Sequence, residues 1–243
     1  MKKGKIHVGT SGWSYKHWKE TFYPKDIKQK EWLEYYYSKF KTVEVNNSFY
    51  RIPEDKTFES WKDSTPKNFL FSVKANRAIT HYKYLKDKKK VDDFLEKVNI
   101  LKSKLGPVLF QLPPNYKYHK EVLEKFLKGL PQKFRYTMEF RNKEWWNDEA
   151  YDLLKKYNVA FCIYELGDVQ TENVVTADFV YIRLHGPDGK YKGNYEDNTL
   201  KMWNGHFNDW LDVGKDVYCY FDNDENGYAP KNALKLLEIN EKS

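Results

Sequence analysis

Strand-like and helix-like patterns alternate along this chain from one end to the other. Eight short runs of apolar and β-favouring residues are separated by segments in which apolar residues recur with a helical period. This alternation favours a parallel sheet covered by helices, because each apolar strand is then buried on both faces. Eight strands in 243 residues fit a TIM barrel, and we predict a single α/β domain of this kind over residues 1–243.

The bounds of these elements follow from the same patterns. Strands are expected at residues 6–9, 42–46, 69–74, 108–112, 136–140, 159–166, 179–185 and 217–221. Helices are expected at residues 29–40, 57–64, 89–104, 120–129, 147–157, 199–211 and 230–238. The connection between the sixth and seventh strands is too short for a full helix, so an irregular link is predicted there. A doubly wound open sheet is the alternative, but no GxGxxG follows a strand, so a dinucleotide site has no support.

Arginine is placed selectively in a chain that otherwise uses lysine. The formal net charge is +7, and 42 residues are Lys or Arg. This balance permits attraction to anions, nucleic acid included, but a general lysine bias would produce it as well. Just five of these residues are Arg, and four of them fall at or after the end of an expected strand: Arg51, Arg77, Arg141 and Arg183. Arginine suits bidentate recognition of phosphate or carboxylate, so the pattern predicts an anionic ligand.

Polar side chains gather where the expected strands end. In the stretch FVYIRLHG, the residues Tyr181, Arg183 and His185 share one face because side chains alternate along a strand. The other strands end in the same way, with Glu44, Asn46, Lys74, Gln111, Glu139, Arg141, Glu165, Asp222 and Asn223. In a TIM barrel the site lies at these ends. We expect Lys74, Glu139 and Arg183, all on odd-numbered strands, to meet in one layer.

Several chemical roles fit these residues. Glu44 or Glu139 could serve as general base or acid, and Lys74 could stabilise an anion or act as a nucleophile. Each has a structural alternative, since a Glu–Arg pair can be a buried ion pair that fixes packing. No cofactor is predicted. A divalent metal held by residues from the set His81, His185, Glu44, Glu139 and Asp222 is left open, although neither HxH nor HExxH occurs.

The two cysteines and the lack of long apolar runs indicate the cellular context of the protein. Cys162 and Cys219 lie in separate apolar strands without CxxC spacing, which is typical of buried thiols in a reducing compartment. The first residues, MKKGKIHVGT, include no apolar signal region, and no apolar run is long enough to cross a membrane. We therefore expect a cytoplasmic protein that does not associate with membranes.

The motifs together resemble those of a known family. GTSGWSYKHW, VEVNNSFYRIP, ITH, KLGPVLFQLPP, EFRNKEWW, FVYIRLHG and YFDNDENGYAPKNA are similar, in this order, to motifs of the YecE-like family, domain of unknown function 72. The resemblance implies a TIM barrel and no established reaction. Its motif positions correspond to Trp13, Tyr15, Glu44, Asn46, Tyr50, Arg51, Lys74, Thr80, His81, Gln111, Glu139, Arg141, Arg183, His185, Tyr195 and Asn223. Glu165 stands where an Asp is usual and Asp222 where an Asn is usual, which leaves the roles of both open.

Two classes of function are compatible with this interpretation of the strand-end residues. The first is an enzyme of hydrolase or phosphoesterase type acting on a small anionic or phosphorylated substrate. The second is a non-catalytic protein that binds nucleic acid or another polyanion. For the first, the candidate catalytic residues are Glu44, Lys74, Glu139 and His185. The candidate substrate-binding residues are Trp13, Tyr15, Asn46, Tyr50, Arg51, His81, Gln111, Arg141, Arg183, Tyr195 and Asn223. The oligomeric state does not follow from the sequence.

Overall fold

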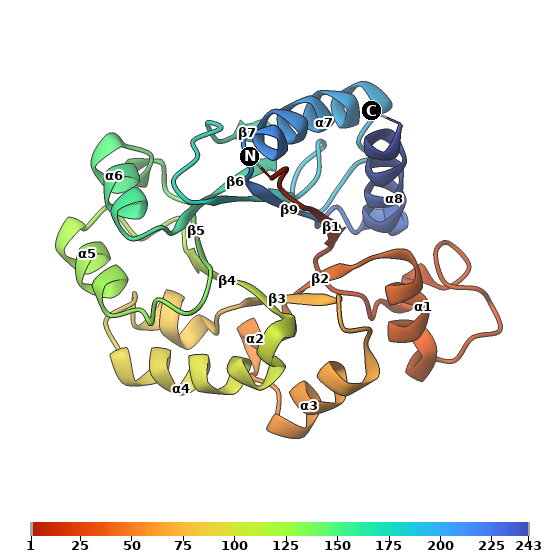
Figure 1. The fold of residues 1–243 in the computed structure, drawn as a ribbon, viewed down its shortest axis with the longest axis horizontal. Coiled ribbons are helices and arrows are strands. Elements are labelled where there is room, and N and C mark those ends of the chain that lie inside the picture. The colour runs from red at the N-terminus through yellow and green to blue at the C-terminus, as the bar shows by residue number, and fades with distance from the viewer. Residues whose placement is uncertain (1, 243) are drawn as a thin grey trace. The chain divides into compact units, whose positions relative to one another are not determined.

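The computed structural model describes residues 2–242 and divides into two compact units. Unit 1 comprises Met1–Glu44, Ile163–Asn173 and Phe179–Ser243, and unit 2 comprises Val45–Cys162 and Val174–Asp178. Figure 1 shows the elements of both units along the chain. The prediction that residues 1–243 form one domain stays a prediction.

Unit 1 is built on parallel strands that are buried on both faces. β1 (Ile6–Thr10) pairs with β9 (Asp216–Phe221), and β9 pairs with β8 (Phe179–Leu184), both in parallel. The end of β6 (Ala160–Leu166) lies beside β8, where the amide of His185 donates to the carbonyl of Glu165 at 2.8 Å. A parallel bridge joins Ser11 to Glu44 in β2 (Thr42–Val45). The carboxyl ends of β1, β2, β8 and β9 therefore lie at one edge of unit 1.

Helices cover the strands of unit 1. These are α1 (Trp32–Lys39), α7 (Asp197–Asp212) and α8 (Tyr228–Glu241). Unit 1 also contains the short 3₁₀ turns η1 (Lys16–Trp18), η2 (Gln29–Glu31) and η6 (Glu225–Gly227). Figure 1 shows α7 and α8 side by side, and α8 packs on β1 and β9. Leu200, Trp203, Phe207 and Leu211 are the buried apolar stripe of α7, as their spacing predicts.

Unit 2 is also built from parallel strands covered by helices. β3 (Leu70–Lys74), β4 (Leu105–Leu112) and β5 (Tyr136–Phe140) are parallel neighbours, and β5 pairs with the first residues of β6. The covering helices are α3 (Asp55–Ser64), α4 (Lys88–Val98), α5 (Lys120–Lys128) and α6 (Asp148–Lys156), with short turns η4 (Asn99–Lys104) and η5 (Lys143–Trp145). Asn147 caps α6, because its side chain accepts a 2.9 Å hydrogen bond from the amide of Ala150.

Besides the 3₁₀ turns η1, η5 and η6, three short elements have no counterpart in the sequence prediction. These are a single helical turn α2 (Asn47–Tyr50), a π-helix η3 (Ala78–Tyr82) and the two-residue strand β7 (Val169–Gln170). β7 folds back antiparallel on β6, so the link from β6 to β8 is a hairpin and loop in place of a helix, which confirms the predicted irregularity. Each element is too short to display a period, which is why the hydrophobic pattern misses it.

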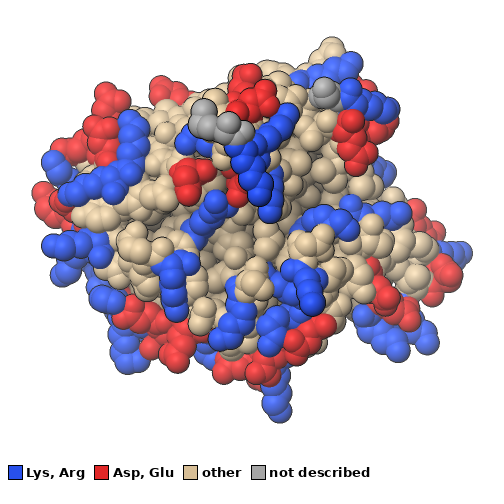
Figure 2. Space-filling model, in the orientation of Figure 1, with Lys and Arg blue, Asp and Glu red and all other residues tan. Residues whose placement is uncertain are grey.

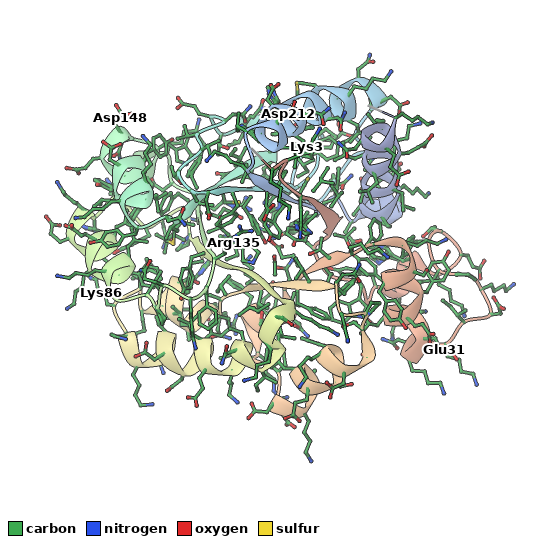
Figure 3. The ribbon with its side chains drawn as sticks, viewed as in Figure 1. Lys3, Glu31, Lys86, Arg135, Asp148 and Asp212 are labelled. Atoms are coloured by element: carbon green, nitrogen blue, oxygen red, sulfur yellow. The ribbon has the colours of Figure 1, made fainter. Side chains whose placement is uncertain are left out.

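The surface is rich in exposed charge pairs. Figure 3 shows Lys3 beside Asp212 at the end of α7, and the two form an ion pair of 3.0 Å. Lys88 and Lys89 pair with Asp92 and Asp93 one turn further along α4, each at 2.7 Å. Pairs this exposed contribute little to the free energy of unfolding.

Candidate functional site

The carboxyl end of β3 in unit 2 is fixed by two side chains from neighbouring loops. Ser48 Oγ donates to the carbonyl of Lys74 at 2.7 Å, and Asn76 Nδ2 donates to the carbonyl of Ser48 at 2.8 Å. Asn76 Oδ1 accepts from the amide of Ala78 at 2.9 Å, which holds the start of η3. These bonds hold Ser48, Lys74 and Asn76 together within unit 2.

Lys74 is a nearly buried cationic residue. The residue is 8 % exposed, and its ammonium lies 4.5 Å from the centroid of the Phe49 ring. Phe49 also packs edge-on against His81, with ring centroids 4.9 Å apart. A cation over an aromatic face is stabilised by the ring quadrupole, and more strongly where water is partly excluded.

His81 is held as a neutral imidazole. Burial is the main cause and the positive charge of Lys74 the second, and together they lower the pKa of His81 to about 4. Its Nδ1 lies 2.9 Å from Thr80 Oγ1, which also lies 3.4 Å from the carbonyl of Asn76. If the Thr80 hydroxyl proton points to that carbonyl, Oγ1 accepts from Nδ1–H. The lone pair of His81 then resides on Nε2 and can accept a proton.

Glu139 and Arg141 form an ion pair at the end of β5, because residues two apart on a strand share a face. The carboxylate is fully buried and the Arg141 side chain is 12 % exposed. Cys162 Sγ lies 3.8 Å from Glu139 Oε2. Lys74, Glu139 and the guanidinium of Arg77 all influence the pKa of His81, which places the four groups in one neighbourhood.

This set of residues, which we call the unit 2 cluster (Phe49, Lys74, Arg77, His81, Glu139 and Arg141), has an excess of positive charge. Its three cations outnumber its single carboxylate by two charges while His81 is neutral. Tyr50 lies at its exposed rim, in contact with Arg77 and Phe49, and Gln111 is half-buried in register with Glu139. Arg51 follows Tyr50 in the chain and is exposed. Asn46 Oδ1 is a buried acceptor without a hydrogen-bond partner in the described part of the chain. The cluster can attract an anion and offers one neutral proton acceptor.

Unit 1 holds a second group of charged side chains, centred on Glu44. Its Oε1 accepts from Ser11 Oγ at 2.7 Å and from the Nε and Nη2 of Arg183 at 3.1 and 2.6 Å. Its Oε2 accepts from the hydroxyl of Tyr181 at 2.6 Å. Glu44 is 0 % exposed and Arg183 1 %. The contacts of Tyr181 and Arg183 confirm that they share one strand face.

Asp222 and His185 extend this network. His185 Nδ1 lies 2.9 Å from Asp222 Oδ2, and Arg183 Nη1 lies 3.4 Å from His185 Nε2. A guanidinium can only donate, so Nε2 accepts and the ring proton resides on Nδ1, directed at Asp222. Asp222 also accepts from Arg183 Nη2 at 3.3 Å and is the most exposed of the three, with 10 % of its side chain accessible. Solvent therefore reaches the network at this carboxylate.

The network of unit 1, in contrast with the unit 2 cluster, is net negative. One cation, Arg183, faces the two carboxylates of Glu44 and Asp222. Tyr15 lies close by, with its hydroxyl donating to the carbonyl of Ser11 at 2.6 Å, and burial followed by the charge of Asp222 raises its pKa above the usual range. Asp224 accepts from Trp18 Nε1 at 2.5 Å, and burial raises its pKa. The backbone of Trp13 accepts from the hydroxyl of Tyr23.

Tyr195 and Asn223 have structural partners in unit 1. Tyr195 is 2 % exposed and its hydroxyl accepts from the amide of Gly186 at 3.0 Å. Asn223 Nδ2 donates to the carbonyl of Gly193 at 2.9 Å and to Asn232 Oδ1 at 2.8 Å. These bonds fasten the loop that follows β8 to the start of α8.

Glu165, another polar residue at the end of an expected strand, also has a partner. It accepts from Trp203 Nε1 at 3.1 Å, and burial raises its pKa.

The predicted site residues thus fall into two sets. Lys74, Glu139, Arg141 and His81 come together in unit 2, and Glu44, Arg183, His185 and Tyr15 come together in unit 1, where they are joined by Asp222. The layer expected from Lys74, Glu139 and Arg183 stays a prediction. Sequence reasoning missed Ser11, Phe49 and Tyr82. Ser11 shows no pattern by itself, whereas the consecutive aromatic residues after the second strand were a usable signal for Phe49.

Metal ligation finds no support in the arrangement of side chains. Among residues 2–242, no three His, Cys, Asp or Glu side chains are grouped so that they could hold a metal ion. Cys162 and Cys219 are free buried thiols, as predicted. No helix in the same range combines the length and apolar character needed to cross a membrane.

The parallel strands, their covering helices and the polar strand ends define an α/β protein of the TIM-barrel type. Solved structures agree: a DUF72 family protein from Thermotoga maritima MSB8 is similar with a TM-score of 0.89 and 26 % identity, covering 98 % of this chain and 99 % of the other. A DUF72 family protein from Enterococcus faecalis V583 shares the fold, with a TM-score of 0.84 and 21 % identity over 98 % and 96 % of the two chains.

The sequence comparisons identify the family. The sequence model of the family described as "Protein of unknown function DUF72" matches residues 7–243, and the chain belongs to this family. The UPF0759 protein YunF of Bacillus subtilis (strain 168) is 28 % identical, with 96 % of this chain and 94 % of that protein covered. The family resemblance expected from the motifs is therefore confirmed.

Proposed function

We propose that the protein binds an anionic ligand, bearing a phosphate or carboxylate group, at the strand ends of unit 2. The observation that carries this proposal is the near-complete burial of the residue Lys74 beside a neutral histidine, in a cluster with excess positive charge. Removing a cation from water is costly, and an incoming anion offsets that cost more fully where the local dielectric is low. Arg77 and Arg141, two of the arginines placed at the ends of expected strands, contribute to this excess of positive charge.

We further propose that the ligand is hydrolysed. His81 supplies the general base: its Nε2 accepts a proton from an attacking water as the water oxygen bonds to the phosphorus or carbonyl carbon. The same proton passes to the leaving oxygen as its bond breaks, so neither charge nor electrons are left over. Lys74 and the arginines stabilise the negative charge that develops on the ligand. The pKa of His81 keeps the base unprotonated at neutral pH, and a bound anion that offsets the charge of Lys74 raises this pKa toward the range in which an imidazole is an effective base.

The second candidate function, non-catalytic binding of a polyanion by a broad basic surface, has less support. Figure 2 shows Lys and Arg interspersed with Asp and Glu over α4, α5 and α6 on the face in view. Several of these charges are paired, as in Lys156 with Glu124 at 2.9 Å and Lys120 with Glu149 at 2.6 Å. A polyanion would meet a mixed surface there, so binding is better assigned to the compact unit 2 cluster.

Calorimetric titration with inorganic phosphate and citrate tests the anion site. Lys74→Ala should weaken binding at least tenfold, while Lys74→Arg should retain most of it because the charge is kept. Lys156→Ala removes a surface lysine that pairs with Glu124 and serves as the matched control. Circular dichroism checks that each variant is folded. Unchanged binding by a folded Lys74→Ala variant would refute the proposed anion site.

Hydrolysis is tested separately with p-nitrophenyl phosphate as the probe. His81→Asn should remove turnover and leave phosphate binding intact, because the variant loses the proton acceptor but keeps the cations. Equal turnover by the wild-type protein and His81→Asn would show that His81 is not the base.

A further inference from the structure

Two tyrosines and an arginine form an exposed stack at the rim of the unit 2 cluster. Tyr50 is 69 % exposed and Tyr82 62 %, and they are two of the five large apolar side chains that stand out as exposed within residues 2–242. The guanidinium carbon of Arg77 lies 5.6 Å from the centroid of each ring. Arg77 thus holds both rings by cation–π contacts while leaving much of their surface open to solvent.

The positions of these three residues are set by the two short helical turns α2 and η3. Tyr50 ends the helical turn α2, Arg77 precedes the π-helix η3, and Tyr82 ends it. π-helical turns are rare, and they occur frequently at functional sites because the widened turn redirects side chains. Here the turn places Thr80 in the buried interior, His81 in the cluster and Tyr82 in solvent within three residues.

Phe49 connects the stack to the anion site. Its ring packs at right angles to Tyr50, with centroids 5.1 Å apart, and its face lies 4.5 Å from the Lys74 ammonium. The exposed rings and the cation of Lys74 are thus neighbours of the same phenyl group. A ligand that has a flat ring and an anionic group a few bonds apart can engage both at once.

We propose that the ligand of unit 2 is a nucleotide or a nucleotide unit of a single strand, its base stacked on Tyr50 and Tyr82 and its phosphate beside Lys74. This inference rests on the proposed anion site and names the class of ligand for it. Aromatic side chains stack on bases of any sequence, and an arginine guanidinium adds cation–π attraction. The clustering of exposed rings around a cation, next to an anion site, matches this two-part chemistry better than it matches an inorganic anion.

The test compares four probes by calorimetry: inorganic phosphate, ribose 5-phosphate, adenosine monophosphate and a ten-residue oligothymidylate. The wild-type protein should bind adenosine monophosphate more tightly than ribose 5-phosphate. The Tyr50→Ala/Tyr82→Ala variant should lose about tenfold or more of its affinity for adenosine monophosphate and none for inorganic phosphate. Tyr50→Phe/Tyr82→Phe should bind like the wild-type protein, because the ring faces are kept. Tyr157→Ala, which removes a tyrosine under Lys156 elsewhere in unit 2, is the control.

Several outcomes distinguish the hypotheses. An equal loss of phosphate and adenosine monophosphate in the double alanine variant would overturn the stacking role, and so would equal wild-type affinity for adenosine monophosphate and ribose 5-phosphate. Loss of nucleotide preference with phosphate binding intact supports it. Phosphate binding that survives in Lys74→Ala refutes the anion site itself, whatever the tyrosines do. Tighter, strongly salt-dependent binding of the oligonucleotide would identify a strand as the source of the nucleotide, and comparable affinities would identify a free nucleotide.

Discussion

The guanidinium of Arg183 is bound to the carboxylate of Glu44 in a position that solvent does not reach. Nη2 and Nε lie 2.6 and 3.1 Å from Oε1, and the two side chains are 1 % and 0 % exposed. All the hydrogen bonds that Glu44 accepts through its side chain in the described residues are from Ser11, Tyr181 and Arg183. Glu44 is therefore better explained as the group that positions Arg183 than as a free general base, the role suggested by its place on the strand.

Removing one partner of this pair should destabilise the fold strongly. Arg183→Met leaves the carboxylate of Glu44 buried without a cation and should lower the free energy of unfolding by about 3–5 kcal/mol, whereas Glu44→Gln should cost less because Arg183 keeps Asp222 as a counter-ion at 3.3 Å. The double variant should recover a part of the Arg183→Met loss, because the fully buried charge of Glu44 is then gone and Asp222, which is partly exposed and hydrogen-bonded to His185, is the carboxylate left without Arg183. Denaturant unfolding of all four proteins measures the coupling. Losses that simply add in the double variant would show that the two side chains do not interact energetically.

The hydroxyl of Tyr181 makes a charge-assisted hydrogen bond that can be tested alone. Tyr181→Phe removes the 2.6 Å bond to Glu44 Oε2 and should cost about 1.5–3 kcal/mol of the free energy of unfolding. The matched control is Tyr136→Phe, which removes a 2.8 Å bond to the neutral carbonyl of Pro131 and should cost about 0.5–1.5 kcal/mol. Equal costs for the two variants would contradict the charged state of Glu44.

His81 should make stability depend on pH in the acid range. Its pKa is lowered from the usual 6.5 to about 4 in the folded protein, so between these values the unfolded chain binds a proton that the folded one does not. Stability therefore decreases as the pH falls from about 6.5 to about 4. The contribution should be about 1–2 kcal/mol, since the ring is partly open to solvent. Urea unfolding at pH 7 and pH 5 should show a smaller difference in His81→Asn than in the wild-type protein. An NMR titration of His81 near pH 6.5 would contradict the expectation.

The loop after β8 offers a test of backbone conformation. Gly186 and Gly189 both have φ of +123°, a region unfavourable for other residues, but an added Cβ at Gly186 would lie 2.1 Å from the carbonyl of Lys192. At Gly189 it would meet nothing within 4 Å. Gly189→Ala should cost about 1–3 kcal/mol for conformation alone, and Gly186→Ala should cost more because of the clash. Gly205→Ala, in the open surface of α7, should instead stabilise by up to about 1 kcal/mol. Thermal unfolding ranks the three variants.

Some of the candidate site was predictable, and the limits have physical causes. The charged residues at strand ends were found because parallel strands terminate at one edge, and the strand period places Tyr181 with Arg183. The stack of Tyr50, Arg77 and Tyr82 was not found as a unit. It depends on α2 and on the π-helix η3, which are four and five residues long and leave no periodic signal.

The sequence by itself determined the α/β class, the succession of strands and helices and the presence of a polar strand edge, because local hydrophobic period and turn residues encode these features. The tertiary structure decided which charges meet. Arg183 pairs with Glu44, which is 139 residues away in the sequence. The charge of Lys74 lowers the pKa of His81, and the π-helix that holds His81 leaves no pattern in the sequence. Several acidic residues end the strands and are equally suitable partners by composition. The choice among them depends on which strands are neighbours and on how the side chains pack, and packing over such separations is a property of the folded chain alone.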